Sequence, residues 1–106
     1  MDHARMARVL SLLATVVRVV ASVIAGLIVV YAVFVFFEAN PANPLVELTR
    51  GVREDFGWFT QDLFAPEDPR IAETVNAALA ALVWVVAGTL ISKLIVRLTP
   101  ASRARV

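Results

Sequence analysis

Two long stretches of the chain contain no charged residue and consist mainly of aliphatic and aromatic side chains. They are residues 19–37 and residues 74–92, each 19 residues long. A helix of that length spans about 28 Å, close to the hydrocarbon thickness of a lipid bilayer. A soluble domain of this size has no core large enough to bury two such helices. The pattern therefore predicts two transmembrane helices, at residues 19–37 and 74–92.

The segment before the first span, residues 1–18, has a different pattern. Its polar positions, together with one just inside the span, recur every three or four residues: Arg5, Arg8, Ser11, Thr15, Arg18 and Ser22. That spacing is one face of a helix, so the segment is predicted to be a basic amphipathic helix continuous with the first span. Arg18 then lies at the edge of the hydrocarbon, where its long side chain reaches the lipid headgroups. The alternative is that the stripe lines a polar path or docks a partner.

The connection between the spans, residues 38–73, carries a third pattern. Asn43 followed by Pro44 predicts a helix start, with the asparagine as N-cap. Apolar residues then follow at steps of three and four: Leu45, Leu48, Val52, Phe56, Phe59 and Leu63. These positions predict an amphipathic helix at about 44–63, bent at Gly57, that lies on the outer leaflet or on the outer mouth of the spans. A partner-docking face or a plug is the alternative. Asp68-Pro69 repeats the cap-and-proline signal before the second span.

Together these elements predict an all-α membrane protein, a two-span antiparallel helical hairpin with an amphipathic interfacial helix in the connecting loop. Small residues allow helices to approach closely in lipid, and the candidates for helix packing, within the hairpin or between copies, are Ser22, Gly26, Ala77, Ala81, Gly88 and Ser92. Basic and tryptophan side chains hold helix ends at the membrane surface, and the candidate membrane-interface anchors are Arg5, Arg8, Arg18, Trp58, Lys93 and Arg97.

The charges divide between the loop and the two ends of the chain. Residues 1–18 and 93–106 hold seven basic residues and one acid, whereas residues 38–73 hold eight acids and three arginines. Short basic segments beside a span stay in the cytoplasm, so both termini are predicted to be cytoplasmic and the acidic loop to face outward. The second helix is predicted to stop before Pro100, leaving a basic tail within 93–106. The predicted location is the inner (plasma) membrane.

Composition removes most chemistry from consideration. The chain is 59% hydrophobic and 18% charged, with no cysteine and a single histidine, His3. It has no Ser/His/Asp set, no HExxH and no glycine-rich phosphate loop, so we predict no enzyme activity and no cofactor. Glu67, Asp68 and Glu73 are the one candidate cation site, but they are better explained as a solvated turn and helix cap. The few basic residues beside the membrane also argue against nucleic acid as a partner.

The junction after the first span, Asn-Pro-Ala-Asn-Pro-Leu-Val at residues 40–46, is followed by LTRGVRE and a second span. Over residues 27–98 this order resembles one half of the YggT-type small membrane proteins. The resemblance implies a role in membrane organisation, division-related processes or osmotic tolerance, without catalysis. The chain departs from that pattern, because it has one unit and a PEDP turn where a proline- and arginine-rich segment is expected. Its Ala/Val/Arg-rich composition is similar to that of high-GC bacteria such as actinobacteria.

These observations favour a small, non-enzymatic structural or accessory subunit. Its predicted partners are the lipid bilayer and either further copies of itself, as a homo-oligomer, or a larger membrane-protein complex. Two rivals remain open. One is a pore-forming hairpin of holin type, which a long structured loop disfavours. The other is a channel or transporter subunit that uses the polar stripe between Arg5 and Ser22.

Overall fold

The computed structural model describes residues 2–98. Its elements are α1 (Asp2–Phe36), α2 (Pro44–Phe56), the 3₁₀ helix η1 (Trp58–Thr60) and α3 (Pro69–Arg97). All regular structure in this range is helical, which confirms the predicted all-α class. The predicted stop at Pro100 and the basic tail beyond it lie outside the described residues.

Both long helices expose apolar side chains over most of their surface. By length and composition, His3–Phe36 and Pro69–Arg97 can each cross a membrane. In the most apolar window of each, only 22% of the residues are buried. The core helix of a soluble protein is mostly buried, so these two helices do not pack as such a core.

The chain divides into two compact units. The first, called here the loop unit, is Val23–Trp84, and the second, the terminal unit, combines Met1–Ser22 with Val85–Val106. Each unit therefore contains a segment of α1 and a segment of α3.

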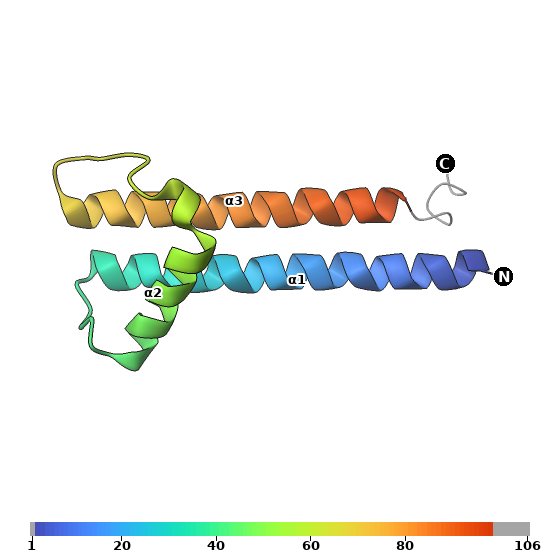
Figure 1. Cartoon of the computed structure of the whole chain (residues 1–106), viewed down its shortest axis with the longest axis horizontal. Coiled ribbons are helices and arrows are strands. Elements are labelled where there is room, and N and C mark those ends of the chain that lie inside the picture. Colours follow the sequence, from blue (N-terminus) through green and yellow to red (C-terminus); the bar gives the residue numbers. More distant parts are fainter. Residues whose placement is uncertain (1, 99–106) are drawn as a thin grey trace. The chain divides into compact units, whose positions relative to one another are not determined.

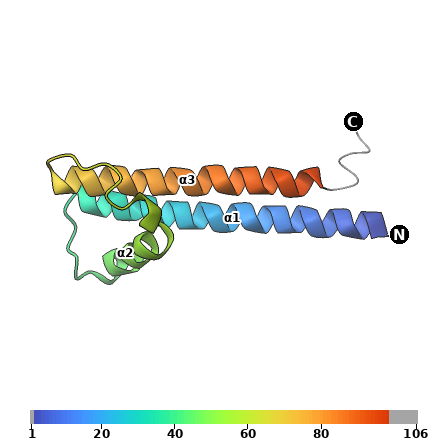
Figure 2. The ribbon, with the colours of Figure 1, turned by 45° about the horizontal axis from the view of Figure 1, so that its top comes forward.

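In the loop unit, the last part of α1 and the first part of α3 lie side by side and run in opposite directions (Figure 1). Their contact is built mainly from small side chains: Ala25, Ile28, Ala32, Ala77, Ala80 and Ala81. Alanines at this contact let the two backbones approach closely, and Ile28 fills the space between them at 0% exposure. Helix α2 crosses this pair of segments (Figures 1 and 2).

The start and end of α2 have identifiable causes. As the sequence predicted, Asn43 caps the helix, because its side chain accepts a hydrogen bond from the Leu45 N–H at 2.9 Å. The helix ends at Phe56, and the Gly57 N–H donates to the Arg53 carbonyl at 2.9 Å. α2 is therefore 13 residues long, shorter than the predicted 44–63, because the chain leaves the α-helical path at Gly57 instead of bending there.

In the terminal unit, residues 2–22 of α1 and 85–97 of α3 bury small side chains, Ala14, Ala21 and Ser92. Gly88 is also buried, and a Cβ built on it would lie 2.5 Å from the Ala21 Cβ. The segments approach each other here as closely as a glycine allows.

Candidate functional site

Helix α2 has a packed face, an apolar flank and a charged flank, and residues of the three kinds follow one another in the same order along the sequence. The residues buried against α1 and α3 are Val46, Thr49 and Arg53. Each is preceded by an apolar residue and followed by a charged one, in the triplets LVE (45–47), LTR (48–50) and VRE (52–54). Successive helical residues lie about 100° apart around the axis. One flank of α2 is therefore apolar, the opposite flank is charged, and the packed face lies between them.

The contacts of α2 show which of the two flanks faces the loop ends of α1 and α3. On the charged flank, Arg50 interacts with Tyr31, which also interacts with Glu73 near the start of α3. On the apolar flank, the Phe56 ring packs edge-on against Trp84, with ring centroids 5.9 Å apart. Because Trp84 is further along α3 than Glu73, the charged flank faces the loop ends of α1 and α3. The apolar flank faces away from those ends, toward the part of α3 that contains Trp84.

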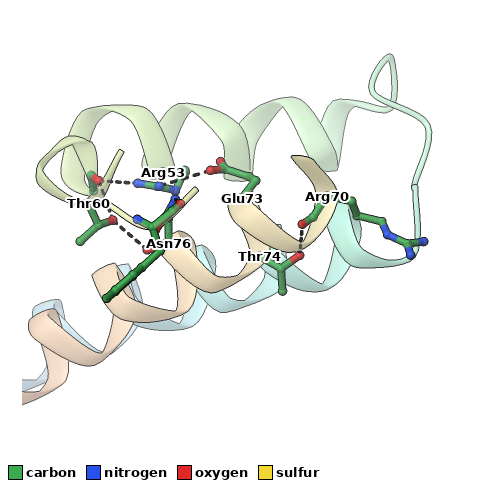
Figure 3. Close-up of polar contacts among 8 residues, drawn as sticks. Arg53, Thr60, Arg70, Glu73, Thr74 and Asn76 are labelled. Carbon is green, nitrogen blue, oxygen red and sulfur yellow. Dashed lines mark hydrogen bonds and ion pairs between the residues drawn. The ribbon is translucent and has the colours of Figure 1, made fainter. Parts of the chain in front are cut away.

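Arg53 is the centre of the contact between α2 and α3. Its side chain is 0% exposed, although arginine is among the residues least often buried. The guanidinium donates to the Gly57 carbonyl through Nη1 and to Glu73 Oε1 through Nη2, the latter at 3.3 Å (Figure 3). Gly57 leaves the space for this, since a Cβ there would lie 2.8 Å from Arg53 Nη1 and 3.1 Å from the Ala80 Cβ. The planar guanidinium thus joins the end of α2 to the first turns of α3.

A second set of hydrogen bonds fixes the chain after α2. The Thr60 hydroxyl lies 2.7 Å from the Asn76 carbonyl and 3.2 Å from the Gly57 carbonyl, within hydrogen-bonding distance of both (Figure 3). The Asn76 side chain accepts from the Phe64 N–H at 3.0 Å and donates to the Phe64 carbonyl at 2.9 Å. The structure gives it the backbone of the loop as its partner.

Of these contacts between residues 53–64 and α3, that of Trp84 lies furthest along α3 from its start. Its indole N–H donates to the Phe56 carbonyl, the last of α2, at 2.6 Å. Together with the contacts of Arg53 with Glu73 and of Asn76 with Phe64, it ties residues 53–64 to α3 over about three turns. The arrangement is a polar clasp, defined here as Arg53, Thr60, Glu73, Asn76 and Trp84. Backbone carbonyls and Glu73 accept most of its hydrogen bonds, whereas Arg53 Nε is buried without a partner among the described residues.

The clasp positions backbone rather than a reactive group. Within residues 2–98, no three His, Cys, Asp or Glu side chains come together as a metal site. The three carboxylates considered from the sequence are separated in role. Glu73 pairs with Arg53, and Asp68 accepts from the Arg70 N–H at 2.9 Å as a helix cap. Glu67 is exposed.

The six small residues predicted for helix packing divide into two groups. Ala77 and Ala81 are buried in the core of the loop unit, and Gly88 and Ser92 are buried in the terminal unit. Ser22 and Gly26 lie on the exposed face of α1, where a Cβ at Gly26 meets nothing within 4 Å. Within this chain their place is taken by Ala21 and Ala25, one residue earlier in each case.

The six predicted membrane anchors are all exposed: Arg5, Arg8, Arg18, Trp58, Lys93 and Arg97. Trp58 lies in η1 and is 67% exposed. Three of the six, Arg18, Lys93 and Arg97, border one hollow in the terminal unit. Arg5 and Arg8 do not line it.

Sequence reasoning missed Arg53, because it expected the apolar stripe of the loop helix to form the contact with the membrane or with the spans. Leu45 and Leu48 of that stripe are 63% and 59% exposed. The signal in the sequence was the three triplets LVE, LTR and VRE. The middle residue of each, at positions 46, 49 and 53, lies between an apolar and a charged neighbour and therefore falls on the face that packs.

Replacing Asn76 with alanine is expected to loosen the loop without unfolding the helices. The Phe64 N–H and carbonyl would lose their partner, at a cost of about 1–2 kcal/mol. Hydrogen exchange of the Phe64 amide should accelerate about tenfold. Thr74→Ala is the matched control, because the Thr74 hydroxyl bonds only to Arg70 of its own helix at 2.8 Å. Equal acceleration in the two variants would contradict the clasp.

Comparison of the chain with protein-family models, with curated proteins and with solved structures gives no significant match.

Proposed function

We propose that this chain is a small integral membrane protein with two antiparallel spans and cytoplasmic termini, and that it acts as a non-enzymatic accessory subunit. In this role it associates with a larger membrane protein or with further copies of itself. The membrane location rests on the two long apolar helices. The accessory role is supported by how the polar groups of the loop are used.

The observation that carries the proposal is the exposure of large apolar side chains on the faces of α1 and α3 that are not packed against the other helix. Large hydrophobic residues that are 40% or more exposed recur along α1 from Met6 to Phe36 and along α3 from Leu82 to Val96. A monomeric soluble protein rarely exposes a contiguous apolar patch larger than a few hundred Å². Lipid acyl chains cover such a surface without cost.

The flanks of α2 support the same orientation. A helix lying in the outer leaflet needs an apolar side toward the acyl chains and a charged side toward water. Glu47 and Glu54 are exposed on the flank that faces the loop ends of the spans, and Leu45 and Leu48 are exposed on the other. The acidic loop is then on the outer side, as the excess of basic residues at the two chain ends also favours.

The polar clasp supports a structural rather than a catalytic role. Arg53, Thr60 and Asn76 are each at most 3% exposed. Both terminal nitrogens of Arg53, the Thr60 hydroxyl and the Asn76 amide bind backbone carbonyls or Glu73, and the remaining donor, Arg53 Nε, is buried out of reach of solvent. A catalytic group needs a free donor, base or nucleophile that a substrate can reach. The buried polar residues of the loop instead hold α2 in a fixed place, which suits a rigid surface for a neighbouring protein.

The test is photo-crosslinking in native membranes, with a photoreactive residue placed at Gly26. This position is open, whereas Ile28, two residues further along α1, is 0% exposed and serves as the internal control. The proposal expects a reproducible protein adduct at position 26, either a dimer of this chain or one larger partner, and none at position 28. Adducts with lipid alone at every exposed position would count against an accessory subunit.

A further inference from the structure

A hollow with a volume of about 360 Å³ lies between the two segments of the terminal unit. It is lined by Arg18 from α1 and by Ser92, Lys93, Val96 and Arg97 from α3. Lys93 and Arg97 are four residues apart and therefore share a face of α3. Arg18 approaches the same space from the other helix, so three cations converge on one site.

Nothing of opposite charge accompanies these cations. The described ion pairs, Arg53–Glu73, Arg70–Glu38 and Arg70–Asp68, all belong to the loop unit. In the sequence of the terminal unit the only acid is Asp2, sixteen residues before Arg18. That separation is about 24 Å along a helix, well beyond the Debye length of about 8 Å. The hollow is thus a positively charged site without an internal counter-ion.

The place of the hollow in the sequence matches the level of the lipid headgroups. Arg18 directly precedes the uncharged run 19–37, and Lys93 directly follows the uncharged run 74–92. Charged side chains at the end of a span extend toward the interface, where phosphate groups lie. Val96 adds an apolar contact to the same hollow, and Ser92, 6% exposed, adds a hydroxyl.

We propose that this hollow binds the phosphate of an anionic phospholipid in the cytoplasmic leaflet. A guanidinium can bind two phosphate oxygens at once, and an ammonium group adds a third contact. Basic pockets between membrane helices on the cytoplasmic side have the chemistry for such headgroups. The inference rests on the proposed membrane placement, because an anionic headgroup reaches the hollow only if the chain is embedded with this end at the inner surface.

The experiment uses the full chain in nanodiscs of phosphatidylglycerol and phosphatidylcholine, with lipid retention measured by native mass spectrometry. Arg18→Gln/Lys93→Gln is expected to lower phosphatidylglycerol retention at least about tenfold relative to phosphatidylcholine. Arg5→Gln/Arg8→Gln is the matched control, since it removes the same total charge from positions on α1 outside the hollow, and should leave retention within about twofold. Lys93→Arg keeps the charge and should retain the lipid.

Three outcomes would overturn the site. Equal loss in the two double variants would mean diffuse attraction of anionic lipid to a basic segment. Displacement of the lipid by millimolar inorganic phosphate would mean a free-anion site. Unchanged retention in Arg18→Gln/Lys93→Gln, with the helix content and membrane extraction of the unaltered chain, would remove the lipid site and leave the membrane assignment standing. Failure of the membrane assignment is seen separately, as recovery of the unaltered chain in the soluble fraction.

Discussion

Arg53→Ala is expected to lower the free energy of unfolding by about 3 kcal/mol or more. The guanidinium is 0% exposed and holds both Glu73 and the Gly57 carbonyl, so its removal leaves a cavity and a partly buried carboxylate without its partner. The loop should detach from α3 first. The measurement is denaturation of the purified chain in detergent, followed by circular dichroism and by the fluorescence of the two tryptophans, of which Trp84 bonds through its indole to the end of α2.

Arg70→Ala is the matched control. Arg70 also forms ion pairs, with Glu38 at 3.6 Å and Asp68 at 3.9 Å, but its side chain is 39% exposed. Solvent-exposed pairs contribute about 0–1 kcal/mol, so this variant should be nearly as stable as the unaltered chain. Adding Glu73→Gln to Arg53→Ala should cost little more, because the two residues act together. Equal losses for Arg53→Ala and Arg70→Ala would show that burial of Arg53 does not decide the stability of the loop.

Gly88→Ala is expected to force the two segments of the terminal unit apart, with a loss of about 2 kcal/mol. The new methyl group would lie 2.5 Å from the Ala21 Cβ and 4.0 Å from the Val17 carbonyl oxygen. An alanine Cβ has no rotamer by which to move aside, so the helix backbones must shift. The same unfolding measurement in detergent applies. The distance between spin labels placed on the two segments should report their separation directly.

Two further variants isolate the cause of that loss. Gly26→Ala makes the same chemical change on α1, where a Cβ meets nothing within 4 Å, and alanine's better helix propensity should leave stability unchanged or raised by up to about 1 kcal/mol. Ala21→Gly added to Gly88→Ala removes the clashing atom and should restore most of the loss. If Gly26→Ala were as damaging as Gly88→Ala, the close approach at Gly88 would not be the reason.

The helices of the fold could be predicted from local signals in the sequence. The charge-free runs predicted where the long helices lie, because length and hydropathy are properties of single segments. The starts of α2 and α3 followed from Asn43-Pro44 and Asp68-Pro69, whose side chains cap the backbone two residues on. These capping bonds form within a few residues, so the sequence alone carries the information.

The contacts between segments were less accessible. The periodicity of the loop selected its apolar stripe, but the face that packs is the one containing Arg53, since the acceptors for that arginine, Gly57 and Glu73, come from different elements. Likewise, Ser22 and Gly26 fit a small-residue motif as well as Ala21 and Ala25 do. Only the rotation of α1 against α3 separates the two pairs, and that rotation is set by contacts distant in sequence.

The central claim is that residues 38–73 and the two chain ends lie on opposite sides of a lipid bilayer. Because the chain contains no cysteine, single variants Glu67→Cys and His3→Cys each provide one reactive thiol at an exposed position. In intact cells, a membrane-impermeant maleimide should label position 67 and leave position 3 unlabelled until the membrane is opened with detergent. Equal labelling of both positions in intact cells, or recovery of the chain in the supernatant after ultracentrifugation without detergent, would contradict the account.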